Sequence, residues 1–129
     1  MLVNRRTVVV EWGDCDPNGI VFNPHFFAWF DASVHALLKC AGLSLDQLIR
    51  EYGITGLPLG ETQVKFLLPL RYGDEIIIET KVVEIHRCSF NLQHRVMHRG
   101  VLAVECSETR VMTAFDPLAG RLRALPLPP

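Results

Sequence analysis

A short connection near the start of the chain gathers several side chains that could do chemistry. In the segment EWGDCDPNGIVFNPHF, the residues Asp14, Cys15 and Asp16 are consecutive. A carboxylate can attack a carbonyl carbon or activate a water molecule, and a thiolate can act as a nucleophile when a neighbouring base takes its proton. The segment therefore offers two kinds of chemistry, one based on a carboxylate and one based on a thiol.

Each of these residues also has a simpler interpretation. An aspartate before proline and glycine is common in turns, so Asp16 could serve only to shape the loop, and Asp14 is interpreted as a turn residue. Isolated cysteines are usually buried and unreactive, and Cys15 forms no activating motif with His25 or His35. On the local pattern alone, a turn role for Asp16 is favoured over a catalytic one.

The elements on either side position this connection. The β-branched and aromatic run Thr7–Trp12 predicts a strand that ends at Gly13. Asn23 is a favoured N-cap, Pro24 suits the first helical position, and Gly42 suits the position just after a helix end. These residues frame a long helix that is apolar on several sides, which indicates that the rest of the fold encloses it.

The remaining sequence predicts one short helix and then a series of long strands. Ser44 and Gln47 form a capping box before the helix Leu45–Tyr52, which Gly53 closes. After this helix, runs rich in β-branched residues alternate with turns and predict antiparallel strands. The predicted strands are Glu61–Leu68, Glu75–His86, Ser89–His98, Val101–Phe115 and a short Arg121–Leu125.

This order of elements predicts an α+β fold in which residues 1–129 form a single domain. One antiparallel sheet of five or six strands is expected to wrap around the long central helix, because the sheet is the only partner large enough to cover the helix. The unpaired edges of such a sheet favour a homodimer or a dimer of dimers.

Composition and charge argue against several classes of protein. Hydrophobic residues make up 49% of the chain and charged residues 21%, and the formal net charge is −1. This charge does not provide the positive field typical of nucleic-acid binding, and no apolar run is long enough to span a bilayer. The first residues lack the pattern of a secretory signal. We therefore expect a cytoplasmic protein that binds neither nucleic acid nor membrane.

The cysteines and histidines predict neither a disulfide framework nor a metal site. The 4 cysteines are widely separated and include no CxxC pair. His94 and His98 share one face of a predicted strand, with Glu105 or Glu108 opposite, but a third defined ligand is missing. We predict no metal and no cofactor.

Four segments together resemble a known family. The segments EWGDCDPNGIVFNPHFFAWFDAS, GITGLPLGETQVKF, EIHRCSF and GRLRALP are similar to the hot-dog-fold 4-hydroxybenzoyl-CoA thioesterases, in the branch that carries an aspartate in the loop after the first strand. The resemblance implies a hot-dog fold and hydrolysis of an aromatic, hydroxybenzoyl-type CoA thioester to the free acid and CoA. It also implies active sites that lie between subunits.

The same resemblance assigns roles to individual residues. It makes Asp16 the catalytic carboxylate, either as nucleophile or as general base, and the backbone N–H of Asn23 the oxyanion donor. Asp31 matches an aspartate near the ring hydroxyl of the substrate, although a buried carboxylate could equally bond a neighbouring strand. From the residue types themselves, Phe22, Phe26 and Phe30 could line an aromatic acyl pocket, although phenylalanines at helical spacing more often belong to the core. Leu57 replaces a threonine beside the ring, which leaves room for other aromatic or related acyl groups.

Arginines are expected to bind the phosphates of CoA. The resemblance assigns this role to Arg87, Arg121 and Arg123, and Arg110 is a further candidate. The family's basic cluster is reduced here, since His86 and Cys88 flank Arg87.

Two other functions remain open from the sequence. One is a thioesterase of the YbgC type with a broader preference for short and medium acyl chains. Phe22-Asn23 argues against this alternative, because that group typically has tyrosine and histidine at these positions. The other is a non-catalytic acyl-CoA binding module. The presence of Asp16 argues against this alternative, because a binding module does not need the catalytic carboxylate.

Overall fold

The structure is a computed structural model that describes residues 2–128. Two helices, a short 3-10 turn and seven strands follow one another along the chain. Their bounds are β1 Val3–Val9, η1 Trp12–Asp14, α1 His25–Cys40, α2 Leu45–Tyr52, β2 Leu59–Phe66, β3 Glu75–Ile85, β4 Ser89–His98, β5 Val101–Val111, β6 Thr113–Asp116 and β7 Arg121–Ala124.

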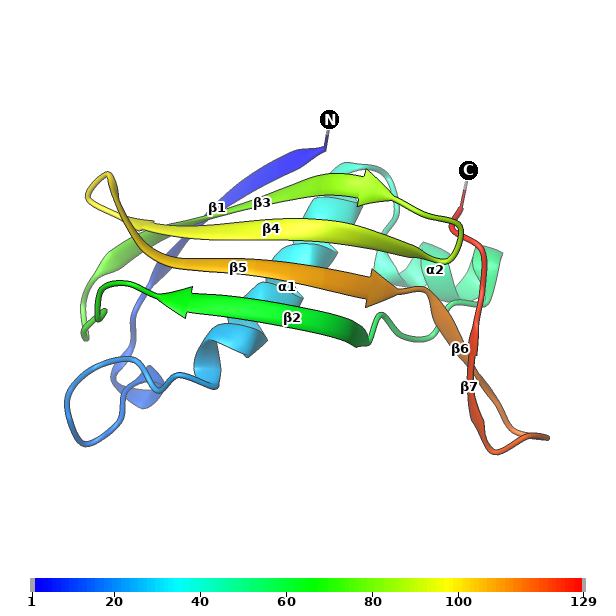
Figure 1. Cartoon of the computed structure of the whole chain (residues 1–129), viewed down its shortest axis with the longest axis horizontal. Coiled ribbons are helices and arrows are strands. Elements are labelled where there is room, and N and C mark those ends of the chain that lie inside the picture. The colour runs from blue at the N-terminus through cyan, green and yellow to red at the C-terminus, as the bar shows by residue number, and fades with distance from the viewer. Residues whose placement is uncertain (1, 129) are drawn as a thin grey trace.

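Five strands form one antiparallel sheet in the order β1-β3-β4-β5-β2, and α1 crosses one face of it (Figure 1). Alternate residues of the central strands point at the helix and are buried, as in the run Ile76, Ile78, Thr80 and Val82 of β3. Strands β6 and β7 form a separate two-stranded sheet that extends from one end of the main sheet, and Thr113 of β6 also bridges to Gly56. The predicted antiparallel strands are therefore confirmed, with β3, β4 and β5 paired in sequence order, whereas β2 pairs with β5 at the edge and not with β3.

Apolar side chains between α1 and the sheet form two clusters. The first surrounds Phe26 and Phe30 near the start of α1, and the second surrounds Val34 and Leu37 nearer its end. Leu48 of α2 joins the second cluster. The capping box at Ser44 and the left-handed Gly53 bound α2 as predicted.

Two predicted boundaries differ from the structure because pairing decides them. The first strand is Val3–Val9 rather than Thr7–Trp12, since residues 3–9 pair with β3 whereas Trp12 lies in the η1 turn. The predicted strand Val101–Phe115 is broken at Met112, whose amide donates to the Cys88 carbonyl at 2.8 Å. This bond directs the chain out of the main sheet and into β6.

The predicted packing of α1 against one antiparallel sheet is confirmed, and a single chain covers one side of that helix. In one chain α1 lies on one face of the sheet, and its residues Ala28, Asp31 and Ala32 are exposed. These small or charged side chains form the side of α1 that faces away from the strands. No helix within residues 2–128 is long and apolar enough to cross a membrane.

Candidate active site

Backbone hydrogen bonds hold the connection between β1 and α1 in a defined shape. The Asp16 amide donates to the Ile20 carbonyl at 2.9 Å, and the Val21 amide donates to the Leu70 carbonyl at 2.8 Å. The second bond ties the connection to the segment before β3. The loop that carries Asp16 is therefore fixed both within itself and to the rest of the fold.

The carboxylate of Asp16 shapes its own turn and keeps one oxygen available. Its Oδ1 accepts a hydrogen bond from the Asn18 amide at 2.8 Å, and its carbonyl accepts one from the Gly19 amide at 2.9 Å. Gly19 has a φ of 78°, a conformation that favours glycine. Its Oδ2 accepts no hydrogen bond from residues 2–128, and the side chain is half-buried. The turn role and a chemical role for Asp16 are therefore compatible.

The start of α1 leaves one backbone donor free. The N-cap is Pro24 rather than Asn23, which corrects the predicted cap by one residue. The amides of residues 25–27 donate to carbonyls three residues earlier at 2.8 to 3.2 Å, so this first turn satisfies its own donors. Pro24 has no N–H. The Asn23 amide donates to no acceptor within the described part of the chain, and it remains available to a ligand.

An apolar hollow lies beside this donor. It has a volume of about 250 Å³, and its lining includes Asn23, Phe26, Phe66 and Leu68. Phe66 and Leu68 are 47% and 46% exposed, although both are large apolar side chains. Phe22, placed in the acyl pocket by the sequence, is 53% exposed, and its carbonyl accepts from the amide of His25.

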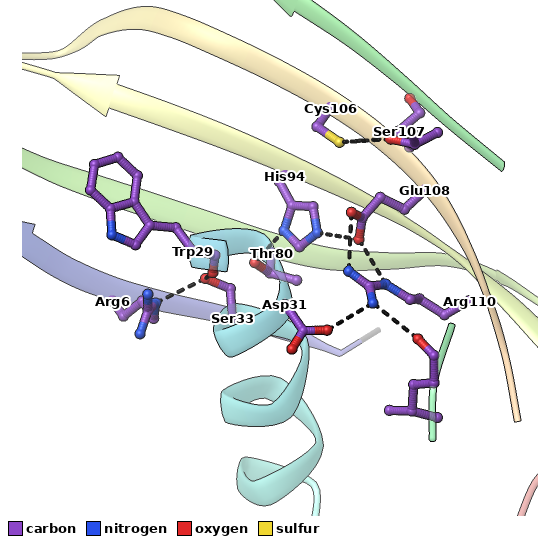
Figure 2. Close-up of polar contacts among 12 residues, drawn as sticks. Arg6, Trp29, Asp31, Ser33, Thr80, His94, Cys106, Ser107, Glu108 and Arg110 are labelled. Atoms are coloured by element: carbon purple, nitrogen blue, oxygen red, sulfur yellow. Dashed lines mark hydrogen bonds and ion pairs between the residues drawn. The ribbon is translucent and has the colours of Figure 1, made fainter. Parts of the chain in front are cut away.

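Asp31 has a partner inside the fold. Its Oδ1 accepts a hydrogen bond from Arg110 Nη1 at 2.9 Å (Figure 2). The Asp31 side chain is 57% exposed, whereas the Arg110 side chain is only 5% exposed. The same Nη1 donates to the Leu57 carbonyl at 2.9 Å, while the Leu57 side chain is buried in the second apolar cluster. Arg110 is thus occupied in the interior and is not a surface site for a phosphate.

A row of buried polar side chains continues behind Arg110. Glu108 receives bonds from Arg110 Nε at 3.1 Å and Nη2 at 3.2 Å, and from His94 Nε2 at 2.8 Å. The Thr80 hydroxyl lies 2.8 Å from His94 Nδ1 (Figure 2). Burial alone would raise the pKa of the Glu108 carboxyl, but the hydrogen bonds and charges of His94 and Arg110 outweigh burial and lower that pKa. Glu108 is therefore held as a carboxylate.

The sequence pattern does not predict this row of side chains, because it relates His94 and Glu108 only as possible metal ligands. A signal was present, since Cys106, Glu108 and Arg110 alternate along β5 and so share one face with buried apolar residues. Burial raises the pKa of the Cys106 thiol to about 11, so this cysteine is unreactive at neutral pH.

The thiol of Cys15 does not form a nucleophilic pair. Its Sγ donates to the Glu11 carbonyl at 3.7 Å. His25 Nε2 is instead paired with Asp14 Oδ1 at 2.6 Å, a contact that joins the connection to the first turn of α1. Asp14, interpreted from the sequence as a turn residue, also accepts from the Glu11 amide at 2.8 Å.

The three arginines assigned to CoA lie away from Asp16 in one chain. Arg87 is in the turn between β3 and β4, and Arg121 and Arg123 are exposed on β7. These elements occupy one end of the sheet, and the connection before α1 occupies the other (Figure 1). In a single chain, Asp16, Phe22 and Asn23 lie in the connection between β1 and α1, and these arginines lie at the other end of the sheet.

Known proteins share both sequence and structure with this chain. The 4-hydroxybenzoyl-CoA thioesterase of Pseudomonas sp. (strain CBS-3) is 35% identical over 125 residues, covering 92% of this chain and 87% of that protein. The solved structure of the enzyme from that strain has a TM-score of 0.92 at 32% identity, covering 99% of this chain and 95% of that one. A solved gentisyl-coenzyme A thioesterase has a TM-score of 0.86 at 31% identity, with coverages of 97% and 96%.

These likenesses confirm the predicted hot-dog fold and the predicted family resemblance. A family model described as "Thioesterase-like superfamily" matches residues 10–129. Since that match spans nearly the whole chain, and a member of known activity is 35% identical over most of it, this protein belongs to the thioesterase-like superfamily.

Proposed function

We propose that the protein hydrolyses an aromatic acyl-CoA thioester of the hydroxybenzoyl type to the free acid and CoA. The observation that carries this proposal is the arrangement at the start of α1. There, a carboxylate oxygen of Asp16 and the amide of Asn23 are both unpaired within residues 2–128, and an apolar hollow of about 250 Å³ lies beside Asn23. A nucleophile or base, an oxyanion donor and a place for an apolar group are the parts that acyl transfer requires.

The proposed reaction uses these parts in a simple way. The thioester carbonyl oxygen accepts a hydrogen bond from the Asn23 amide, which stabilises the negative charge that develops there by about 3 kcal/mol. Asp16 Oδ2 then either attacks the carbonyl carbon or removes a proton from an attacking water. In both routes the carbon–sulfur bond breaks and CoA leaves as a thiolate, which needs no strong general acid. A direct attack produces a mixed anhydride, and water hydrolyses it to regenerate the carboxylate.

The choice of an aromatic acyl group rests on two supports. The related enzymes are named for 4-hydroxybenzoyl and gentisyl groups, which are hydroxylated aromatic acids. In this chain Asp31 presents an exposed carboxylate on α1 two turns after the Asn23 donor, where it could accept a bond from a ring hydroxyl.

A substrate panel tests the proposed function. We expect kcat/KM for 4-hydroxybenzoyl-CoA, 3-hydroxybenzoyl-CoA and gentisyl-CoA to exceed the values for hexanoyl-CoA and octanoyl-CoA by at least about tenfold, because the linear acyl groups have no hydroxyl to donate to Asp31. Release of CoA is measured with an enzyme blank, since Cys40 is an exposed thiol. Faster turnover of the linear substrates would favour the broader thioesterase, and tight binding without hydrolysis would favour the binding module.

We further propose that two chains complete each site as a homodimer, which can pair again as a dimer of dimers. Within residues 2–128, strand β2 lies at the edge of the sheet and pairs with β5 alone, and nearly all of its side chains are exposed. If two β2 edges pair antiparallel, the end of one sheet that carries Arg87, Arg121 and Arg123 lies beside the partner's Asp16 connection. The CoA phosphates would then meet arginines of the other subunit.

Light scattering tests this assembly. We expect a mass of at least twice the 14.6 kDa of one chain at micromolar concentration. An active protein that stays monomeric under assay conditions would contradict the shared site. The cytoplasmic location expected from the sequence stays a prediction.

A further inference from the structure

We propose that Arg110 is a positioning residue for the acyl end of the site, because it fixes the Asp31 carboxylate against the backbone of Leu57. This inference rests on the function proposed above, since it gives Asp31 the task of meeting a hydroxyl on the aromatic acyl group. Arg110 itself does not contact the substrate in this proposal.

One guanidinium nitrogen joins two separate segments. Arg110 Nη1 donates one N–H to Asp31 Oδ1 and one to the Leu57 carbonyl, both at 2.9 Å. Asp31 belongs to α1 and Leu57 to the connection between α2 and β2. Because the two N–H groups of Nη1 lie in the rigid guanidinium plane, the directions of both bonds are set together. Any rotation of Arg110 would move the Asp31 carboxylate relative to the loop.

The rest of the guanidinium leaves Arg110 little freedom to rotate. Nε and Nη2 bind the two carboxylate oxygens of Glu108 at 3.1 and 3.2 Å, so the pair is bidentate. Four of the five guanidinium N–H groups are therefore engaged. Glu108 is fixed in turn by His94, which stacks on Phe30 with a distance of 4.6 Å between ring centroids. This packed row connects the core of the sheet to Asp31 (Figure 2).

The exposure of the two partners shows which of them a ligand can reach. Arg110 is 5% exposed and lies behind Asp31, whose side chain is 57% exposed. Oδ2 of Asp31 accepts no hydrogen bond from residues 2–128. A carboxylate with one oxygen anchored and the other open is a directed acceptor, suited to a donor such as a phenolic hydroxyl. Arg110 therefore determines where on the aromatic ring a hydroxyl is recognised.

The decisive measurement is a ratio of specificities. We compare kcat/KM for 4-hydroxybenzoyl-CoA with kcat/KM for benzoyl-CoA, which lacks the hydroxyl. In Arg110→Gln we expect this ratio to fall by about tenfold or more, because the misplaced Asp31 carboxylate no longer accepts a hydrogen bond from the substrate hydroxyl. The ratio should approach the value measured for Asp31→Ala, in which that carboxylate is absent. Turnover of benzoyl-CoA should change by less than about threefold, since that substrate does not use Asp31. If Arg110 had a purely structural role, its replacement would lower kcat/KM for both substrates by the same factor and leave their ratio unchanged.

Two further variants keep the test decisive. Arg110→Gln leaves the charged Glu108 buried beside a neutral group, and the single variant could fail to fold for that reason. The double variant Glu108→Gln with Arg110→Gln removes both charges. If the single variant does not fold, we expect the double variant to show the same fall in the ratio of kcat/KM values. Arg95→Gln is the matched control, because Arg95 is an exposed arginine on the neighbouring strand β4 and its replacement should leave the ratio unchanged.

The outcomes separate this inference from the proposed function. A wild-type protein without hydrolysis of any aromatic acyl-CoA would overturn both. A wild type that prefers the hydroxylated substrate, together with folded Arg110 variants that keep the same preference, would overturn only the role of Arg110. A wild type that hydrolyses both substrates equally would overturn the role of Asp31 and with it that of Arg110.

Discussion

Replacement of Asp16 by asparagine is expected to reduce kcat for the preferred aromatic substrate by at least about 10³-fold, the scale set by loss of a nucleophile or general base. Asparagine has nearly the same shape and keeps an Oδ1 that can accept the bond from the Asn18 amide, which is 2.8 Å long in the wild type. The turn should therefore remain intact while the reactive carboxylate is lost. The measurement is kcat and KM on purified protein, with circular dichroism to check the fold.

Two comparisons make the Asp16 result specific. Asn18→Ala is the control in the same turn, because it keeps the backbone amide that binds Asp16 and should retain activity within about threefold. KM of Asp16→Asn should stay close to that of the wild type, since the Asn23 amide and the hollow are unchanged. Unaltered kcat in Asp16→Asn would exclude the carboxylate mechanism and return Asp16 to the role of a turn residue.

The largest expected effect on stability comes from Arg110→Met. This change leaves Glu108, 3% exposed, without its bidentate partner, and breaking a buried pair in this way costs about 3 to 5 kcal/mol of unfolding free energy. Glu108→Gln combined with Arg110→Met removes the stranded charge and should recover a large part of that loss. The measurement is chemical denaturation of the three proteins at pH 7. Equal stabilities of the single and double variants would show that the charge of Glu108 is not the cause.

The same carboxylate gives the stability a defined dependence on pH. Because the pKa of Glu108 is lowered in the folded state, the unfolded state binds a proton more readily. The stabilisation is fully present above the ordinary glutamate pKa of about 4.3 and is lost as the pH falls through the lowered folded value. In Arg110→Met the buried Glu108 carboxylate keeps only its bond to His94, and protonation relieves a charge that has lost its bidentate partner. Because the unfolded chains titrate alike, the difference in unfolding free energy between wild type and Arg110→Met should narrow as the pH falls from the Glu108 pKa of the folded variant to the lower Glu108 pKa of the folded wild type.

Local signals predicted some elements well. The helix α2 occurs at Leu45–Tyr52 with its capping box, and β4 occurs at Ser89–His98, as expected from the sequence. Such elements are predictable because their boundaries depend on side chains a few residues apart. The start of α1 was predicted to within one residue for the same reason.

Other features depended on contacts between distant segments. The true extent of β1 follows from its pairing with β3, and the break at Met112 follows from a hydrogen bond to Cys88. Residue types alone also did not reveal that α1 keeps an exposed side around Asp31, because the exposed positions depend on where the sheet lies.

The sequence by itself determined the kind of chemistry to expect. The consecutive residues around Asp16, the start of a helix at Pro24 and the resemblance carried by this segment point to a thioesterase without any tertiary contact. They could do so because a turn carboxylate and a helix start lie close together along the chain. Only the tertiary structure decided the environment of Asp31. Its partner Arg110 is 79 positions away and reaches it only when β5 packs against α1, so no local pattern could reveal that pair.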